Sequence, residues 1–236
     1  MKKLYEKWAG RPFDRDTVSD LLKLATPIFV YAPIYLIWFI WIEHHRFSHY
    51  AIIHTQLDDL IPFVEAFIVP YYMWFLYVSV TLLILMFSFE VEDYYKNFFF
   101  LATGMTIFLI ISTLFPNMHH LRPVVMPRDN IFTHLVLGIY KADTPANLWP
   151  SIHVYNSIGT MIAIQRNRRF NKTAKVIGHI IGASIILSTV FVKQHSVYDV
   201  ITAFIMATIF YYVFYHTSLV ESFCRKRQEQ VAYRYN

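Results

Sequence analysis

The sequence predicts an all-α fold, a polytopic membrane protein built as a six-transmembrane-helix bundle. Its 236 residues are 56% hydrophobic and 18% aromatic, and only 16% are charged. Mean hydropathy is +0.38, and so low a charged fraction is unusual for a soluble domain. Apolar runs of roughly 20 residues, long enough to cross a bilayer, recur along the chain. Lysine and arginine are also distributed unevenly between the polar segments that separate these runs.

The six spans are expected at about residues 21–42, 61–89, 98–115, 150–164, 176–192 and 199–215. Pro27 and Pro33 fall inside the first span, where membrane helices tolerate proline if neighbours satisfy the freed backbone groups. Pro150 suits the first position of the fourth span, where its missing N–H costs nothing. The segment from Glu90 to Asn97 is expected as a short charged turn, and residues 116–149 form the longest non-spanning segment.

Three parts of the chain follow from this division. Residues 1–20 form a cytoplasmic N-terminal arm, residues 21–216 the six-helix domain, and residues 217–236 a basic cytoplasmic tail. The arm interleaves basic residues with Trp8 and Phe13, which favours an interfacial segment over nucleic-acid binding because an apolar span follows directly. No cleavable signal peptide is apparent, since residues 1–20 contain no apolar core. Cys224 is the only cysteine, which excludes an intramolecular disulfide.

The basic residues orient the bundle. Six spans place both termini on one side, and that side collects 16 of the 21 lysines and arginines. The opposite side holds five, which are Arg46, Arg122, Arg128, Lys141 and Lys193. Cytoplasmic loops carry the excess of positive charge. We therefore expect cytoplasmic termini in the plasma membrane, with Arg122, Pro150–His153 and Lys193–Asp199 together on the extracytoplasmic face.

The segment Lys193–Asp199 organises a predicted active site on that face. His195 and Asp199 are four residues apart and lie on one helical face. The carboxylate can fix the imidazole tautomer and leave the other ring nitrogen free to attack. His153, at the start of the fourth span, can protonate a leaving oxygen and later activate water.

The remaining residues of the set bind phosphate. Arg122 can grip phosphate oxygens with its planar fork, and Lys193 adds a point charge. The helix N-terminus at Ser151 offers unpaired backbone N–H groups to an anion. These groups together suit phosphoryl transfer, in which catalysis is mostly positioning and charge stabilisation.

The motifs resemble those of the type 2 phosphatidic acid phosphatase superfamily. They are Arg122-Pro123, then Pro150-Ser151-x-His153, then Ser188-Thr189-x5-His195-x3-Asp199. The resemblance implies six membrane helices, an outward-facing active site and a lipid phosphate as substrate. It also implies that His195 is the nucleophile, His153 the general acid, and Arg122 and Ser151 phosphate ligands.

Three positions depart from the superfamily pattern. Phe115 stands where a lysine is usual, Ile152 replaces a glycine, and Thr189 replaces an arginine. Two phosphate-binding cations are thus missing, with Lys193 as a substitute for one. Pro-Ser-x-His with Ser-Thr resembles the branch that includes inositol-phosphorylceramide and sphingomyelin synthases. A lipid-phosphate phosphatase is therefore the first expectation, with a phosphotransferase to a lipid hydroxyl and a non-catalytic binding or transport relative as alternatives.

Other readings of single residues stay open. His195 and Asp199 can be a structural polar pair, Arg122 a headgroup anchor, Lys193 an interfacial anchor and Ser151 only a helix cap. Glu65, near the outer end of the second span, is expected to support the site by pairing with Arg122 or Lys193, or else to reach the interface. The outer histidines (His44, His45, His49, His54, His119 and His120) lack convincing metal-ligand spacing, so neither a metal nor another cofactor is expected. The expected partners are a lipid phosphate and membrane lipids, with no nucleic acid, and the sequence does not predict an oligomeric state.

Overall fold

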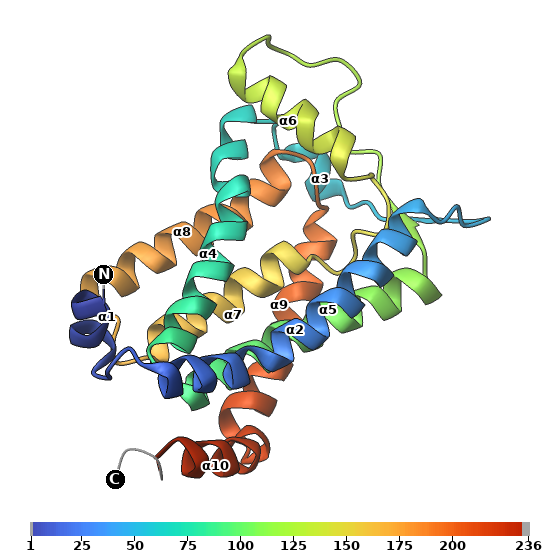
Figure 1. Cartoon of the computed structure of the whole chain (residues 1–236). Helices are drawn as coiled ribbons and strands as arrows, with labels where there is room; N and C mark the ends of the chain where they lie inside the picture. Colours follow the sequence, from blue (N-terminus) through green and yellow to red (C-terminus); the bar gives the residue numbers. More distant parts are fainter. Residues whose placement is uncertain (1, 233–236) are drawn as a thin grey trace.

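The computed structural model describes residues 2–232, with side chains through residue 225, as a bundle of helices (Figure 1). Five helices are long and apolar enough to cross a membrane, in agreement with the predicted class. They are α2 (Arg15–His44), α4 (Ile68–Phe87, preceded by the 3-10 turn Glu65–Phe67), α5 (Val91–Leu114), α8 (Lys172–Phe191) and α9 (Val197–His216). The two prolines of the first span lie inside a continuous α2.

The predicted fourth span is the shorter helix α7 (Ile152–Arg166). Its 15 residues extend about 22 Å, less than the roughly 30 Å of a bilayer core. Helix α7 packs against α4, α5, α8 and α9. Polar residues on α7, such as Asn156, Ser157 and Thr160, are buried. Because its neighbours surround α7, its sequence does not need the uniform apolar surface of a lipid-facing helix.

Small residues let the helices around α7 approach closely. A methyl group built on Gly104 of α5 would fall 2.1 Å from the ring of Tyr155, which stacks on Phe100 with ring centroids 4.5 Å apart. Gly182 of α8 meets Met161 of α7 in the same way. Membrane helices associate through such close contacts, because lipid tails remove the usual hydrophobic driving force.

Both described ends of the chain lie at the same end of the bundle (Figure 1). Helices α1 (Lys2–Ala9) and α10 (Leu219–Ala232) are found there. Arg169, in the turn between α7 and α8, donates to Trp8 O and pairs with Glu90. The expected charged turn is shorter than predicted, since residues 91–97 are the first turns of α5. The buried Lys96 there is satisfied by Glu92 and by Glu221 of α10. Residues 233–236 of the predicted tail lie outside the described residues.

The opposite end of the bundle holds the long connections. Helix α3 (Gln56–Leu60) and helix α6 (Ile131–Ala142) lie there (Figure 1). A short parallel pair, β1 (Ala51–Ile52) with β2 (Asn117–Met118), joins the segment after α2 to the segment after α5. The sequence analysis did not predict this pair. It ties together two loops that are far apart in the chain, and so shapes the end where the candidate site lies.

Candidate active site

The loop that joins α8 to α9 holds His195 in place by backbone bonds. The backbone N–H groups of Gln194 and His195 both donate to Thr189 O, each at 3.0 Å. Ser196 is the N-cap of α9, and its N–H donates to Asp199 Oδ2 at 2.9 Å. This capping box sets Asp199 one turn beyond His195, as the spacing predicts.

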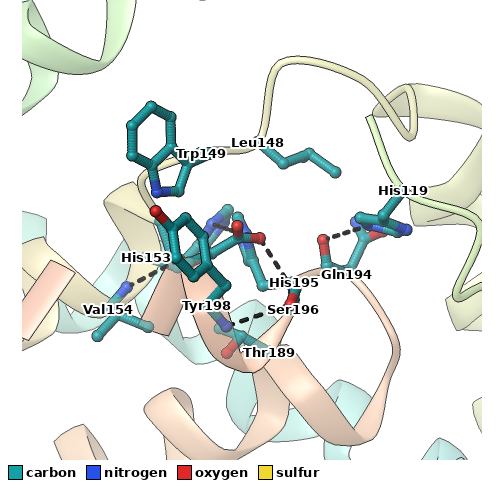
Figure 2. A network of polar contacts seen from close by, with 12 residues as sticks. His119, Leu148, Trp149, His153, Val154, Thr189, Gln194, His195, Ser196 and Tyr198 are labelled. Carbon is teal, nitrogen blue, oxygen red and sulfur yellow. Dashed lines mark hydrogen bonds and ion pairs between the residues drawn. The ribbon is translucent and has the colours of Figure 1, made fainter. Parts of the chain in front are cut away.

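Two histidines and an aspartate form a continuous chain of polar contacts. His195 Nδ1 lies 3.2 Å from Asp199 Oδ2, and His195 Nε2 lies 3.3 Å from His153 Nδ1. Aspartate accepts the Nδ1–H of His195, which leaves Nε2 as the acceptor that faces His153. Figure 2 shows the two imidazoles side by side beneath the Leu148–Trp149 segment. The structure thus brings together the three residues expected to be catalytic.

His153 takes its position from the first turn of α7. Ser151 caps this helix by accepting from Val154 N at 3.3 Å, and the Ser151 N–H reaches Asp199 O at 3.4 Å. The His153 ring stacks on Tyr71, with ring centroids 4.7 Å apart, and lies 4.5 Å from the Trp74 ring. Ser151 is fully buried. Its side chain acts as the helix cap, and its backbone links α7 to α9.

Burial sets the charge state of the loop histidines. Desolvation, with a further contribution from the Arg122 charge, lowers the pKa of His195 to about 3. His119 donates from Nε2 to Gln194 O at 2.9 Å and accepts Leu121 N–H at Nδ1. Its pKa is lowered to about 4, again mainly by burial. Both rings are therefore neutral at neutral pH, the state in which His195 Nε2 carries a free electron pair.

A cavity of about 540 Å³ opens beside this histidine pair. His153, His195 and Asn156 lie on its wall, and apolar and aromatic residues of α2, α4 and α5 form most of the remainder. Two carboxyl groups, Glu43 and Asp143, also line it. Burial raises the pKa of Asp143 to about 7, and the neighbouring Glu43 adds to this rise. Within the described part of the chain, no lysine or arginine lines this cavity.

Arg122 lies behind the cavity wall. Its guanidinium donates to Tyr140 O, Asp143 O and Thr144 O at 2.9–3.3 Å, and it stands 4.5 Å from the Tyr140 ring centroid. Its Nε is buried and has no hydrogen-bond partner within the described residues. Arg122 therefore organises the segment after α6 and reaches the histidines through its charge, rather than through a direct contact with the cavity.

The position of Lys193 differs from the expected one, in which it binds phosphate beside the histidines. Its backbone is in the left-handed region, with φ of 54°. Its Nζ donates to Asp58 O at 2.7 Å and Ile61 O at 2.5 Å, and it lines a separate cavity beside α3. This conformation turns the side chain away from His153 and His195. Lys193 anchors α3 to the loop that carries His195, and is therefore not placed to replace a missing phosphate-binding cation.

Glu65 also differs from its expected pairing. Its carboxylate accepts two bonds from Arg128, at 2.5 and 2.6 Å, and one from Asn130 at 2.9 Å. Neither Arg122 nor Lys193 is among these partners. Because Asn130 caps α6, the ion pair connects the start of α4 to α6 and supports the site only at a distance.

The sequence analysis gave no role to three polar residues of this region, which are Asp58, Asp143 and Gln194. Asp58 accepts from Ser196 Oγ at 2.6 Å and from Val197 N at 2.7 Å. Gln194 donates from Nε2 to Asp143 Oδ2 at 3.1 Å. Asp58 lies 138 residues before Ser196, so only the tertiary fold reveals this contact. No group of three or more histidines, cysteines or carboxylates fit to hold a metal was found among the described residues.

Comparisons with known protein families, with curated proteins and with solved structures found no match. The resemblance in the motifs therefore remains a prediction.

Proposed function

We propose that the protein is an integral membrane lipid-phosphate phosphatase that acts through a phosphohistidine at His195. The proposal rests mainly on the two consecutive side-chain contacts from Asp199 to His195 and from His195 to His153. They lie at the edge of a largely apolar cavity between membrane helices. A neutral imidazole oriented by a carboxylate is an activated nucleophile. The apolar walls suit the hydrocarbon part of a lipid.

The proposed reaction has two steps. His153 enters the reaction as the imidazolium, with its second proton taken from the bound phosphate monoanion. His195 Nε2 attacks phosphorus, and the bond between phosphorus and the leaving oxygen breaks as His153 gives its Nδ1 proton to that oxygen. His153, now neutral and without this proton, then takes a proton from water. The resulting hydroxide attacks phosphorus, the P–N bond breaks, and His195 leaves as neutral imidazole. Each histidine ends in its starting state, as the acid-then-base alternation of two-step hydrolysis requires.

The two histidines must separate for substrate to bind. The 3.3 Å contact between them leaves no space for a phosphoryl group between the nitrogens. The unpaired Nε of Arg122 and the backbone N–H groups at the N-terminus of α7 are the donors that we expect to approach the phosphate. We further propose that α7 completes a six-helix arrangement with the site on the extracytoplasmic face.

A second candidate function is transfer of a phosphate-linked headgroup to a lipid hydroxyl. One observation favours it, namely that Glu43 and Asp143 line the cavity while no described lysine or arginine does. A phosphodiester carries one negative charge, and so needs fewer cations in the site than a phosphomonoester with nearly two.

Activity assays test the proposal and separate the two candidates. Purified protein in detergent receives phosphatidic acid, phosphatidylglycerophosphate or polyprenyl pyrophosphate, and released phosphate is measured. We expect release from at least one substrate, loss of release in His195→Ala, and unchanged release in His134→Ala, an exposed histidine outside the site. No release from any substrate contradicts phosphatase activity. Headgroup transfer from a labelled phospholipid to ceramide or diacylglycerol, without free phosphate, would instead support the second candidate.

A further inference from the structure

A second groove lies between α7, α8 and α9 and extends away from the candidate site toward the opposite end of the bundle. Helices α8 and α9 each pack on α7. Figure 1 shows α8 and α9 diverging from the loop that joins them, with α7 between them. The groove between them has a volume of about 620 Å³ and takes residues at helical spacing from α7, α8 and α9. No role is assigned to it by the proposed chemistry.

The groove is apolar along its length and polar at one end. Met161 of α7, Ala183 and Leu187 of α8 and Phe204 of α9 belong to its apolar wall. Ala183, Leu187 and Phe204 are exposed on the outer surface of the helix bundle. The wall runs from Ile158 to Arg166 along α7, a distance of about 12 Å at 1.5 Å per residue. This length approaches the roughly 15 Å of hydrocarbon in one leaflet.

Basic side chains gather at the polar end of the groove. Arg166 lines the groove itself, and its guanidinium is oriented by Tyr211 Oη at 3.4 Å and by the Tyr215 ring at 5.3 Å. An adjoining cavity of about 520 Å³, which shares Gln165 and His179 with the groove, is lined by Lys172 and Lys175. In the described part of the chain no aspartate or glutamate lines either cavity. The pair of cavities therefore joins an apolar slot to a cationic end.

We propose that this groove binds an anionic phospholipid from the leaflet that contacts the ends of the chain. An acyl chain occupies the slot between α8 and α9, and the headgroup phosphate lies among Arg166, Lys172 and Lys175. Charge complementarity favours this occupant, because basic pockets between membrane helices suit anionic headgroups. A helix of a second copy would fill the apolar slot but leave the three cations without partners. This inference goes beyond the proposed function and does not depend on it.

Native mass spectrometry of the purified protein tests the proposal. The protein in mild detergent is mixed with equal amounts of dioleoyl phosphatidylglycerol and dioleoyl phosphatidylcholine, and the lipid retained is counted. We expect preferential retention of phosphatidylglycerol. Lys172→Gln/Lys175→Gln should reduce it roughly tenfold or more, because each lysine near a headgroup contributes several-fold to binding. Lys2→Gln/Lys3→Gln, which removes the same charge from α1 at the same end, should leave it unchanged.

A second pair of variants tests the slot. Ala183→Trp fills the groove without changing charge and should also reduce retention, whereas Ile177→Trp, on an exposed position of α8 outside the groove, should not. Thermal melting of each variant separates loss of binding from loss of folding. Equal retention of both lipids overturns the proposal, because the site would then show no preference for an anionic headgroup. An unaffected Ala183→Trp overturns it as well, because surface charge outside the groove would then account for the binding. A dimer in the wild type that Ala183→Trp dissociates would also overturn it.

Discussion

The environment of His195 explains why a common residue pair becomes a candidate nucleophile. His195 and Asp199 are 3% and 1% exposed. Water cannot compete for the Nδ1–H there, so the carboxylate determines the tautomer. Two backbone bonds to Thr189 O and the cap at Ser196 prevent the loop from turning the ring away. The same pair on an exposed helix would have neither constraint.

Asp199→Asn tests this arrangement at the level of one residue. The amide retains the shape of the side chain and can still cap the Ser196 N–H, but it removes the charge that stabilises a positively charged phosphohistidine. The analogous change in a serine-protease triad costs about 10⁴-fold in turnover. We expect a kcat loss of about 10²- to 10³-fold, because Arg122 and the N-terminus of α7, which we propose to bind the phosphate, are unchanged. KM should change little, since Asp199 does not touch the phosphate.

The measurement is kcat and KM on the substrate identified above, with thermal melting in detergent as the folding check. Asp129→Asn is the matched control, because Asp129 is exposed and forms its ion pair with His134 on the surface. Wild-type turnover in a well-folded Asp199→Asn protein would show that the His195–Asp199 pair is structural.

At the scale of elements, α3 acts as a clamp on the start of α9. Asp58 bonds to Ser196 and Val197, and Lys193 bonds back to the carbonyls of Asp58 and Ile61. Hydrogen bonds therefore run in both directions between this five-residue helix and the loop that carries His195. This pairing turns an outer loop into part of the support for His195.

Asp58→Asn should weaken this clamp. The Asp58 carboxylate accepts hydrogen bonds from the Ser196 O–H and the Val197 N–H. Asparagine would present its NH₂ group to one of these donors and leave that donor buried without an acceptor. We expect the free energy of unfolding to fall by about 1–3 kcal/mol, read as a lower melting temperature. Asp59→Asn is the control, because the neighbouring Asp59 side chain is exposed and forms its ion pair with His54 on the surface. Equal melting temperatures for the two variants would contradict the clamp.

Two glycines on helices provide a matched test of the packing around α7. Gly104 of α5 has the ring of Tyr155 within 2.1 Å of an added methyl group, whereas Gly138 of α6 has only Tyr72 Oη, at 3.8 Å. Gly104→Ala should cost about 1–3 kcal/mol of stability by overpacking. Gly138→Ala should gain about 0.5–1 kcal/mol, since alanine restricts the unfolded chain more. Chemical or thermal denaturation in detergent measures both, and equal effects would contradict the α5–α7 contact.

At the scale of the whole molecule, one end is basic and holds both described ends of the chain, while the candidate site lies at the other. The positive-inside rule predicts that the basic end faces the cytoplasm. Cysteine labelling tests this orientation in a Cys224→Ser background. Val124→Cys, at a fully exposed loop position, should react with a membrane-impermeant maleimide in intact cells, and Lys3→Cys should react only after lysis. Labelling in the reverse order would place the candidate site in the cytoplasm.

The sequence by itself determined the features that depend on local pattern. Long apolar runs predicted six spans, and five of them are membrane-length helices among the described residues. The predicted ends of these five lie within two residues of the observed ones, whereas the starts of α2, α4 and α5 differ by six or seven residues. The His-x3-Asp spacing and the order of the motifs predicted that His153, His195 and Asp199 would meet. These predictions succeeded because helical periodicity and hydrophobic length are properties of neighbouring residues.

Only the tertiary structure decided which way the charged side chains point. Lys193 turns toward Asp58 O, Glu65 pairs with Arg128, and Arg122 bonds to backbone carbonyls after α6. The pairing of β1 with β2, and the cavity between α2, α4 and α5, also join parts that are distant in sequence. A buried charge takes whichever partner the packing brings within reach, because leaving it unpaired is costly. Spacing along the chain predicts which residue types are present, and the fold determines their partners.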